Sequence, residues 1–409
     1  MSISIKSKSV LISGASIAGP TLAYWLNTYG FNVTVVEKAP VLRSGGYRID
    51  VRGKAVDVVE RMGVMPAIRK VAPDVRGTSI INSKGKRIVD FDDPNVFGMR
   101  QANDAEIMRG DLANILYDVT KDEVEYIFND SIFSITETGE NIKVTFRNTP
   151  ARTFDIVVGA DGLHSNVRSL AFGNDNTFVK NFNYYISIFS IPNFFHLEHW
   201  ELSYFLTGKI INVYNIDKHH EAKALFMFAS DSAFIPQDPG EQKKMLTDHF
   251  KDAGWEVAKM LETLRDSEDF YFDSMSQVYM DSLSKGRIVL LGDAGYCPSP
   301  ASGQGTSLAL IGAYILAGEL ASSQGNYPVA FGSYEQQMRG FIDRNQKLAV
   351  ENLKQMVPKT KAELWMRNNM MRLFLSLPWR KKILKGLLKK IQNKVDEAAN
   401  AITLKDYTI

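Results

Sequence analysis

The stretch "VLISGASIAGPTLAYWL", which runs from Val10 to Leu26, decides how the amino-terminal part of the chain folds. Its first residues, Val10 to Ile12, form a short uninterrupted apolar run, as expected for a parallel strand that is buried on both faces. After Gly19 the apolar residues recur at helical spacing as far as Leu26. The stretch therefore predicts a buried strand, a tight glycine turn and a helix.

The turn has the spacing of a Gly-x-Gly-x-x-Gly dinucleotide fingerprint, with Ser16 in place of the middle glycine. Gly14 permits the tight turn, and Gly19 permits close packing of the helix against the strand. Serine is small enough to let the backbone approach a pyrophosphate, and its hydroxyl can donate to a phosphate oxygen. The free N–H groups at the start of the helix, near Ala18, face such an anion. The serine is therefore compatible with nucleotide binding.

A second predicted strand, "NVTVVEK", ends in Glu37, about 20 residues beyond the turn, where an acidic side chain accepts a ribose hydroxyl. The alternative is an ordinary strand, turn and helix with a chance pattern of glycines. The position of Glu37 favours nucleotide binding over that alternative. We expect the adjacent Lys38 to contact the nucleotide as well.

Two further stretches have the same strand-to-turn pattern. "FDIVVGADGLHSNVR" contains the predicted strand Ile156 to Val158 and then a Gly-Ala-Asp-Gly turn, in which Asp161 orients the loop, accepts from a cofactor hydroxyl or simply forms the turn. In "KGRIVLLGDAGYCPSPASGQGTSLALIGAYILAGEL" the predicted strand Ile288 to Leu291 is followed by Gly292 and Asp293.

A proline- and glycine-rich loop then leads to Gly303, Gln304, Gly305 and an apolar helix. Bare backbone at the start of a helix offers N–H donors to an anionic or carbonyl-rich ring. The loop is too long, too apolar and too structured to be a solvated linker.

Together these three stretches resemble the class A flavin monooxygenases, the group of para-hydroxybenzoate hydroxylase, over most of residues 1–330. The resemblance implies FAD, with Glu37 on the adenosine ribose, Asp293 on the ribityl chain and Arg109 of "EIMRGDL" on the flavin. It also implies that the Asp161 motif serves both FAD and the pyridine nucleotide, and that Pro300 to Gly305 line the isoalloxazine and hold its pyrimidine edge.

Within that group the chain is most similar to the tetracycline-inactivating monooxygenases, in "RSGGYRIDVRG", "EIMRGDL", "FGSYEQQMRGFI" and "GDAGYCPSPASGQG". This resemblance implies that Asp50 contacts FAD and that Arg43 contacts NADPH. The glutamine and histidine that grip the drug in that family do not align here, where "YYISIFSIP" and "AKALFMFAS" are apolar. The expected cofactor contacts are Gly14, Ser16, Ala18, Gly19, Glu37, Lys38, Arg43, Asp50, Arg109, Asp161, Gly292, Asp293, Pro300, Gly303, Gln304 and Gly305.

The expected fold is α/β, with a Rossmann-like FAD-binding domain, a mixed β-sheet substrate domain and carboxyl-terminal helices. The predicted segments are 1–73, 100–175 and 276–325 for FAD, 74–99 and 176–275 for the substrate, and 326–409 for the helices. Alternating stretches such as "KIINVYNI" predict the strands of the substrate sheet. The expected substrate contacts are Phe189, Phe226, Phe228, Pro300 and Gly303, although aromatic residues at period two are more often plain core.

Two carboxyl-terminal stretches each have two possible interpretations. "AELWMRNNMMRLFLSLP" is apolar on several faces, which fits a helix that bridges the two domains at the substrate entrance or one that only buttresses the FAD domain. The basic amphipathic helix of "WRKKILKGLLKKIQNKVDEAANAI" fits a membrane surface or, as we prefer, a docked helix with a solvated face.

Composition excludes several classes of protein. The 409 residues have a formal net charge of only +2, which argues against a nucleic-acid partner. A single cysteine, Cys297, permits no intramolecular disulfide and no cysteine metal cluster, and the adjacent His219 and His220 cannot make a metal site alone. The uncharged run Ala294 to Gly318 is broken by prolines and glycines, so it predicts a loop and a buried helix. We expect a cytoplasmic monomer without a signal peptide or stable membrane insertion.

The resemblance implies the chemistry. NADPH reduces the flavin, molecular oxygen forms a flavin C4a-hydroperoxide, and this hydroxylates an electron-rich phenol or enol, so no side-chain nucleophile or metal is required. Inactivation of tetracycline antibiotics is the activity expected first. The alternatives are hydroxylation of another phenolic or polyketide metabolite, and a flavoprotein that sequesters a ligand without turning it over.

Overall fold

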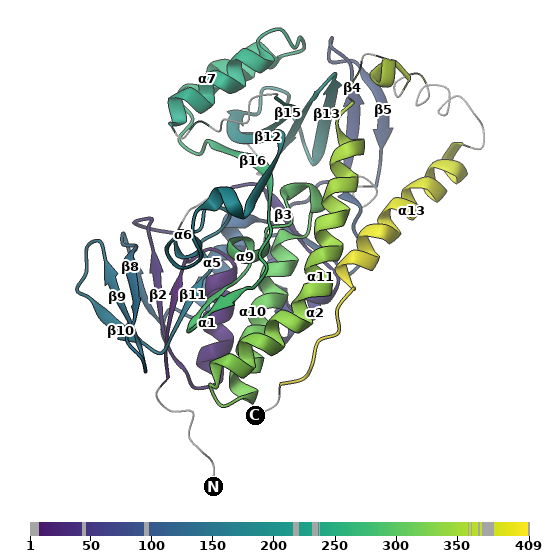
Figure 1. Cartoon of the computed structure of the whole chain (residues 1–409). Coiled ribbons are helices and arrows are strands. Elements are labelled where there is room, and N and C mark those ends of the chain that lie inside the picture. The colour runs from purple at the N-terminus through teal and green to yellow at the C-terminus, as the bar shows by residue number, and fades with distance from the viewer. Residues whose placement is uncertain are drawn as a thin grey trace.

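A computed structural model describes residues 8–42, 46–93, 98–215, 221–230, 236, 238–358, 360, 362–366, 369 and 380–407. In this part of the chain two large sheets lie one beyond the other, and long helices of the carboxyl-terminal part run beside them (Figure 1). The predicted fold class, α/β with a mixed second sheet and carboxyl-terminal helices, is confirmed.

The first sheet has six strands in the order β17-β18-β11-β1-β2-β7. The strands are β1 (Ser9–Ser13), β2 (Asn32–Glu37), β7 (Glu125–Phe128), β11 (Ile156–Gly159), β17 (Ser284–Lys285) and β18 (Ile288–Leu290). All neighbouring pairs are parallel except β17 with β18. The carboxyl ends of β1, β11 and β18 therefore meet at one edge, where the chain continues into Gly14, Asp161 and Gly292. Strands predicted from continuous apolar runs are confirmed.

Several helices belong to the same half of the molecule as this sheet. They are α1 (Ala18–Thr28), α2 (Lys54–Arg61), α3 (Met65–Lys70), α5 (Arg109–Asp118), α6 (Asn166–Phe172), α9 (Asp293–Tyr296) and α10 (Gly305–Ser322). Helix α10 packs against α1, α2 and the long helix α11 (Tyr327–Met356), so it is apolar all round. Its length and composition would suit a membrane span, but 89% of it is buried inside the structure. The buried helix predicted at the end of the uncharged run is thus confirmed.

The second sheet has seven strands in the order β16-β12-β15-β14-β13-β4-β5. The strands are β4 (Gly77–Ile81), β5 (Arg87–Phe91), β12 (Val179–Pro192), β13 (Trp200–Leu206), β14 (Lys209–Asn215), β15 (Glu221–Ala229) and β16 (Tyr271–Val278). Only β13 and β4 pair in parallel, so the sheet is mixed. Its outer face is covered by α7 (Pro239–Phe250) and α8 (Val257–Leu264), and α7 lies at the opposite end of the molecule from α1 (Figure 1).

Smaller elements complete the architecture. They are the pair β3 (Arg48–Val51) and β6 (Ala105–Met108), the sheet of β8 (Ile132–Glu137), β9 (Ile142–Phe146) and β10 (Arg152–Phe154), and the 3-10 turns η1 (Asp175–Thr177) and η2 (Pro300–Ser302).

The carboxyl-terminal helices connect both halves of the molecule. Helix α11 contributes Ala349 and Leu353 to an apolar cluster on the inner face of the second sheet. Helix α13 (Arg380–Ala399) packs Val395 and Ala398 against Leu348 of α11. Of the apolar residues proposed for the bridging helix, Trp365 and Met366 are 69% and 52% exposed, whereas Met370, Met371, Leu373 and Phe374 lie outside the described residues.

Candidate functional site

The turn after β1 requires glycine at two positions. Gly14 has a φ of +108°, and a Cβ built on it would lie 2.5 Å from the carbonyl oxygen of Ala160. A Cβ on Gly19 would lie 1.9 Å from the carbonyl oxygen of Gly14. Helix α1 therefore begins directly against β1, and the first N–H groups of the helix, including those of Ala18 and Gly19, have no acceptor within it. Ser16 is partly exposed at this turn.

Glu37 is held at the end of β2, facing the same turn. Its Oε2 accepts from the N–H of Ala15 at 2.8 Å, and its Oε1 accepts from the N–H of Ala39 at 2.9 Å. An ionised carboxylate has about four acceptor sites. Sites therefore remain for the hydroxyls of a ribose. The neighbouring Lys38 is exposed.

Asp161 joins the carboxyl ends of β1 and β11 to helix α6. It accepts from the hydroxyl of Ser165, from the N–H of Val167 at 3.1 Å and from the hydroxyl of Ser13 at 3.3 Å. Burial raises the pKa of Asp161, and the hydrogen bond from Ser165 opposes that rise. Of the roles open to this residue from sequence, orientation of the loop is the one that these contacts describe. Direct contact with a cofactor stays a prediction.

Asp293 and Arg109 carry opposite charges, and Asp293 lies at the carboxyl-terminal edge of the first sheet. Asp293 is the first residue of α9 and follows Gly292, whose φ is +65°. Burial raises the pKa of Asp293, while the guanidinium of Arg109 lowers it. Neither side chain forms a salt bridge with another residue in the described part of the chain. A Cβ on Gly305 would lie 3.7 Å from Oδ1 of Asp293, so the carboxylate also faces the start of α10.

The loop from Pro300 to Gly305 holds a buried amide that lacks a partner. Gln304 is 0% exposed and donates its backbone N–H to the hydroxyl of Ser302 at 3.0 Å. Its side-chain oxygen and nitrogen have no hydrogen-bond partner among the described atoms. An unsatisfied buried polar group costs about 1–3 kcal/mol. The unpaired amide of Gln304, the free N–H groups at the start of α1 and the charges of Asp293 and Arg109 fit a cofactor with phosphate, hydroxyl and ring-carbonyl groups.

Asp50 lies beside this loop in a network of charges. It accepts from Nη2 of Arg52 at 2.6 Å and from Nη1 of Arg100 at 3.3 Å. The backbone N–H of Arg52 donates to the hydroxyl of Ser307 on α10 at 3.2 Å, and Nη2 of Arg52 would lie 4.0 Å from a Cβ on Gly303. Asp50 is therefore near the predicted flavin loop, although guanidinium groups already occupy its carboxylate. Arg43, predicted to contact NADPH, lies outside the described residues, as do His219 and His220.

The structure places two tyrosines here that the sequence did not identify. The ring centroids of Tyr47 and Tyr271 lie 5.2 Å apart. Burial raises the pKa of both phenols. Tyr271 also donates to Oδ2 of Asp273 at 3.5 Å, and Oδ1 of Asp273 lies 3.2 Å from Nε2 of His164. Only the position of Tyr47 in "RSGGYRID", close to Asp50, hinted at its importance, and nothing in the sequence linked it to β16.

Phe189, Phe226 and Phe228 are core residues in this structure, and their contact with the substrate stays a prediction. All three are 0% exposed, and the rings of Phe189 and Phe226 stack with centroids 5.5 Å apart. They pack beneath α7, where Phe250 meets the rings of Phe226 and Phe228 edge-on. Successive side chains of a strand point to opposite faces of the sheet, and α7 with α8 covers the face that carries these rings.

The opposite face of the same strands looks toward the flavin loop. Its apolar cluster contains Ile186, Ile188, Met227 and Met275 together with Ala301 of the loop. Tyr47 and Tyr271 pack against this cluster. Of the predicted substrate contacts, Pro300 and Gly303 lie on the loop that this face meets.

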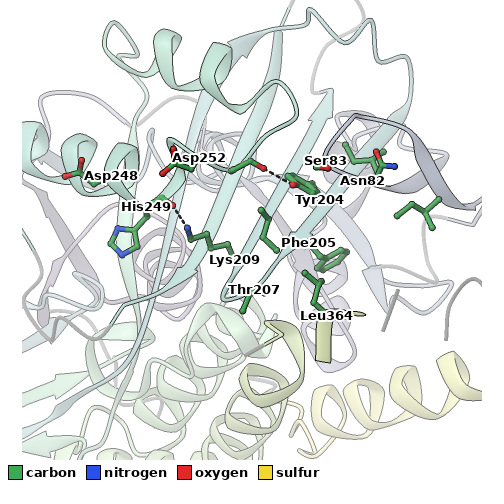
Figure 2. Close-up of a pocket in the computed structure, with 14 residues that line it drawn as sticks. Asn82, Ser83, Tyr204, Phe205, Thr207, Lys209, Asp248, His249, Asp252 and Leu364 are labelled. Atoms are coloured by element: carbon green, nitrogen blue, oxygen red, sulfur yellow. Dashed lines mark hydrogen bonds between the residues drawn. The ribbon is translucent and has the colours of Figure 1, made fainter. Parts of the chain in front are cut away.

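A separate cavity of about 700 Å³ opens at the outer end of the second sheet (Figure 2). The cavity lies between the hairpin that joins β13 to β14 and the carboxyl end of α7, where the ammonium of Lys209 donates to the carbonyl oxygen of His249. Tyr204 donates to the carbonyl oxygen of Ala253 at 2.7 Å on the same wall. No residue of the predicted cofactor set lines this cavity, so we do not place the reaction there.

Comparisons with known proteins agree with the site at the first sheet. Residues 7–326 match the family described as FAD binding domain. An uncharacterized protein, Rv1260, of Mycobacterium tuberculosis (strain ATCC 25618 / H37Rv) is 44% identical over 85% of this chain and 94% of its own length. A flavin-dependent monooxygenase of Legionella longbeachae serogroup 1 (strain NSW150) is 40% identical over 84% of this chain and 88% of its own length. The crystal structure of tetracycline destructase Tet(55) matches with a TM-score of 0.84 and 36% identity over 98% of this chain and 99% of that one.

Proposed function

Because the chain belongs to the FAD-dependent monooxygenases of class A, we propose that it uses NADPH and molecular oxygen to hydroxylate an electron-rich phenol or enol. We propose tetracyclines as the first substrates to test, since the chain is 36% identical to tetracycline destructase Tet(55) over almost its whole length. The observation that carries the proposal is the pair Asp293 and Arg109. Arg109 acts electrostatically on Asp293, which lies just beyond the end of β18, and neither residue forms a salt bridge in the described part of the chain.

Different residues at the edge of the first sheet bind different parts of the cofactor. FAD, when bound, accepts electrons from NADPH and activates molecular oxygen. The N–H groups at the start of α1 bind the pyrophosphate, because a helix amino terminus favours an anion. Glu37 accepts from the adenosine ribose, Asp293 accepts from the ribityl chain, and Arg109 contacts the flavin. The loop from Pro300 to Gly305 holds the pyrimidine edge.

The remaining cofactor assignments follow the same division. Asp50, whose partner Arg52 lies near Gly303, contacts FAD, and Asp161 keeps the loops of β1 and β11 in position for both FAD and NADPH. Arg43 is the proposed NADPH contact. Gly14, Ser16, Gly292 and Lys38 complete the proposed set.

The inner face of the second sheet is the proposed substrate wall. Ile186, Ile188, Met227 and Met275 form a buried apolar face that packs against Ala301 of the flavin loop. Such a surface excludes water from the reacting groups, which protects a reactive oxygen species. Unbranched methionine side chains adapt to ligands of irregular shape. A multi-ring substrate with few charges suits this wall.

We also propose that function divides the chain as the sequence suggests. Segments 1–73, 100–175 and 276–325 hold FAD, segments 74–99 and 176–275 hold the substrate, and segment 326–409 supports both. The strands of the second sheet come from 77–91 and 179–278, which supports this division. We expect the enzyme to act as a monomer in the cytoplasm on a small molecule.

A substrate panel tests the proposal. Purified protein with FAD is mixed with tetracyclines and with simple phenols, and NADPH consumption is measured together with oxygen insertion by mass spectrometry. We expect NADPH consumption that depends on a tetracycline and a product heavier by one oxygen atom. Insertion into a phenol alone would indicate hydroxylation of another phenolic or polyketide metabolite. Ligand binding without flavin reduction would indicate a protein that sequesters its ligand.

A further inference from the structure

We propose that Asn212 selects substrates that carry a neutral hydrogen-bond donor, such as a carboxamide or a hydroxyl, and disfavours substrates that carry a carboxylate. The inference rests on the proposed function, because it concerns the substrate of the same site. Asn212 lies in the middle of β14, in register with Ser203 of β13 and Leu225 of β15. Its side-chain oxygen is the atom that accepts from the substrate.

The alternation of side chains along β14 places Asn212 on the inner face of the second sheet. Its chain neighbours Ile211 and Val213 belong to the core beneath α7. Ile210 lies on the opposite face, in the apolar cluster that meets the flavin loop, and Asn212 shares that face. Asn212 is partly exposed, although Ile210 and Tyr214 on either side of it are buried. It is therefore a polar group that a ligand can reach on a largely apolar face.

Hydrogen bonds to β13 fix the orientation of the Asn212 amide. Nδ2 donates to Oε1 of Glu201 at 2.6 Å and to the hydroxyl of Ser203 at 3.2 Å. An ionised carboxylate only accepts, so the nitrogen of the amide, and not its oxygen, must face Glu201. Both N–H protons of the amide are thus in use. Among the residues that the structure describes, none donates to Oδ1 of Asn212, so this oxygen is left for a ligand.

Arg48 of β3 keeps Glu201 ionised. Its guanidinium donates to Oε2 of Glu201, and its Nη1 lies 3.6 Å from Oε1 of Glu106 on β6. Cζ of Arg48 also lies 3.8 Å from the centroid of the Tyr214 ring. Burial alone lowers the pKa of Arg48, but Glu201 and Glu106 raise it above its usual value, so the guanidinium stays charged. Glu201 is therefore a positioning residue, because it acts on the ligand through Asn212.

The free oxygen of Asn212 determines the chemical class of the ligand. An amide oxygen accepts from a hydroxyl or an N–H group, whereas a carboxylate placed against it finds no donor. The charges of Arg48 and Glu201 offset each other, so the pair attracts neither a cation nor an anion. A substrate without a donor leaves Oδ1 unsatisfied, and a site built to bind an N–H group discriminates strongly against the analogue that lacks it.

The test measures binding to the oxidised, FAD-loaded full chain without NADPH. The probes are N-methylsalicylamide and methyl salicylate, two phenols of nearly the same shape that differ in one N–H donor, and salicylate, which carries a carboxylate. Dissociation constants are obtained from the change in flavin absorbance. We expect the wild type to bind the amide roughly tenfold or more tightly than the ester, and to bind salicylate least tightly.

Variants on β14 test whether Asn212 is the source of this preference. Asn212→Leu should bind the amide and the ester equally. Asn212→Ser, whose smaller side chain cannot reach the ligand, should show the same loss if leucine prevents folding. Asn215→Leu is the matched control, because it makes the same change on the other face of β14, where Asn215 donates to the carbonyl oxygen of Leu197 at 2.7 Å. It should keep the wild-type preference.

Glu201→Gln tests the positioning role. Glutamine donates as well as accepts, so the amide of Asn212 is free to turn its nitrogen toward the ligand. We expect this variant to bind salicylate more tightly than the wild type does, a gain that loss of a merely structural carboxylate would not produce. Unchanged salicylate affinity overturns the positioning role of Glu201.

The remaining outcomes separate the inference from the proposed function. Equal binding of amide and ester by the wild type, an unchanged preference in both Asn212 variants, or loss of the preference in Asn215→Leu overturns the inference alone. A wild type that binds none of the three probes also overturns it. A wild type that prefers the amide but inserts oxygen into no phenol or tetracycline overturns the proposed function alone.

Discussion

At the residue scale, the turn after β1 requires that residue 19 has no Cβ atom. We expect Gly19→Ala to destabilise the protein by about 1–3 kcal/mol and to abolish FAD binding, because overpacking forces the backbone to shift. The added Cβ would lie 1.9 Å from the carbonyl oxygen of Gly14, which belongs to the backbone and cannot rotate away. Urea unfolding and flavin fluorescence measure the two effects.

The matched control is Gly340→Ala in the middle of α11. A Cβ there meets no atom within 4 Å, so the helix gains about 0.8–1.0 kcal/mol from alanine. FAD binding should stay at the wild-type level. Loss of flavin in both variants, or in neither, would contradict the packing argument.

At the element scale, the second sheet has one structural face and one functional face. We expect Phe226→Leu to lower the free energy of unfolding by about 1–3 kcal/mol, since the leucine fills less of the fully buried site beneath α7. Its KM for substrate and its FAD affinity should equal those of the wild type. Met227→Ala, one residue along β15 on the opposite face, should instead raise the KM. A larger KM change in Phe226→Leu would reverse the assignment of the faces.

The carboxyl-terminal segment is fastened to α10 through Glu319. This carboxylate accepts from Nζ of Lys405 at 2.6 Å, from Oη of Tyr407 at 2.8 Å and from Nε2 of Gln337 at 2.6 Å. The ring of Tyr407 fills the space where Gly318 lacks a side chain, since a Cβ there would lie 2.2 Å from Cδ2 of the ring. The residues that follow α13 therefore attach the carboxyl-terminal end of that helix to α10.

This contact predicts a pH dependence. Burial alone raises the pKa of Glu319, but the hydrogen bonds from Lys405, Tyr407 and Gln337 bring it below its usual value of 4.5. The carboxylate therefore contributes stability above the pKa of the unfolded chain, and this stability is lost as the pH falls through the folded pKa. We expect Glu319→Gln to cost about 1–3 kcal/mol at neutral pH and less in acid. Urea unfolding at neutral and at acidic pH measures this cost. An equal cost at both pH values would show that the charge of Glu319 is not the source of the stability.

At the scale of the whole molecule, the cofactor joins segments that are distant in sequence. Glu37, Arg109 and Asp293 come from different parts of the chain, so bound FAD stabilises the folded state as a unit. FAD at about 100 times its dissociation constant should add about 2.7 kcal/mol of stability. Thermal unfolding with and without FAD measures this, and acid precipitation should release all the flavin.

Asp293→Ala should weaken that stabilisation. Loss of a hydrogen bond to a charged group costs about 1.5–3 kcal/mol, which corresponds to a dissociation constant roughly ten to a hundred times larger. Asp118→Ala is the control, because Asp118 is 62% exposed and its salt bridge in the described part of the chain is a surface pair with Lys121. The placement of Asp293 fails if both variants bind FAD equally well.

The sequence by itself determined the first sheet and the turns at its edge. Strands buried on both faces are continuous apolar runs, and the glycines at 14 and 19 are required by backbone geometry within a few residues. Such features are local, so the sequence also placed Glu37 at the end of β2, Asp293 shortly after β18 and the start of α10 after the glycine-rich loop. The family resemblance depends on the same stretches.

Only the tertiary structure decided which face of the second sheet meets the flavin loop. Alternation along β12 and β15 separates two sets of side chains, but α7 and α8 determine which set is buried in the core. The sequence therefore could not assign Phe226 to the core and Met227 to the inner face. The same holds for Tyr47 and Tyr271, whose rings lie 5.2 Å apart although they are distant in sequence, because no local pattern records a contact between distant segments.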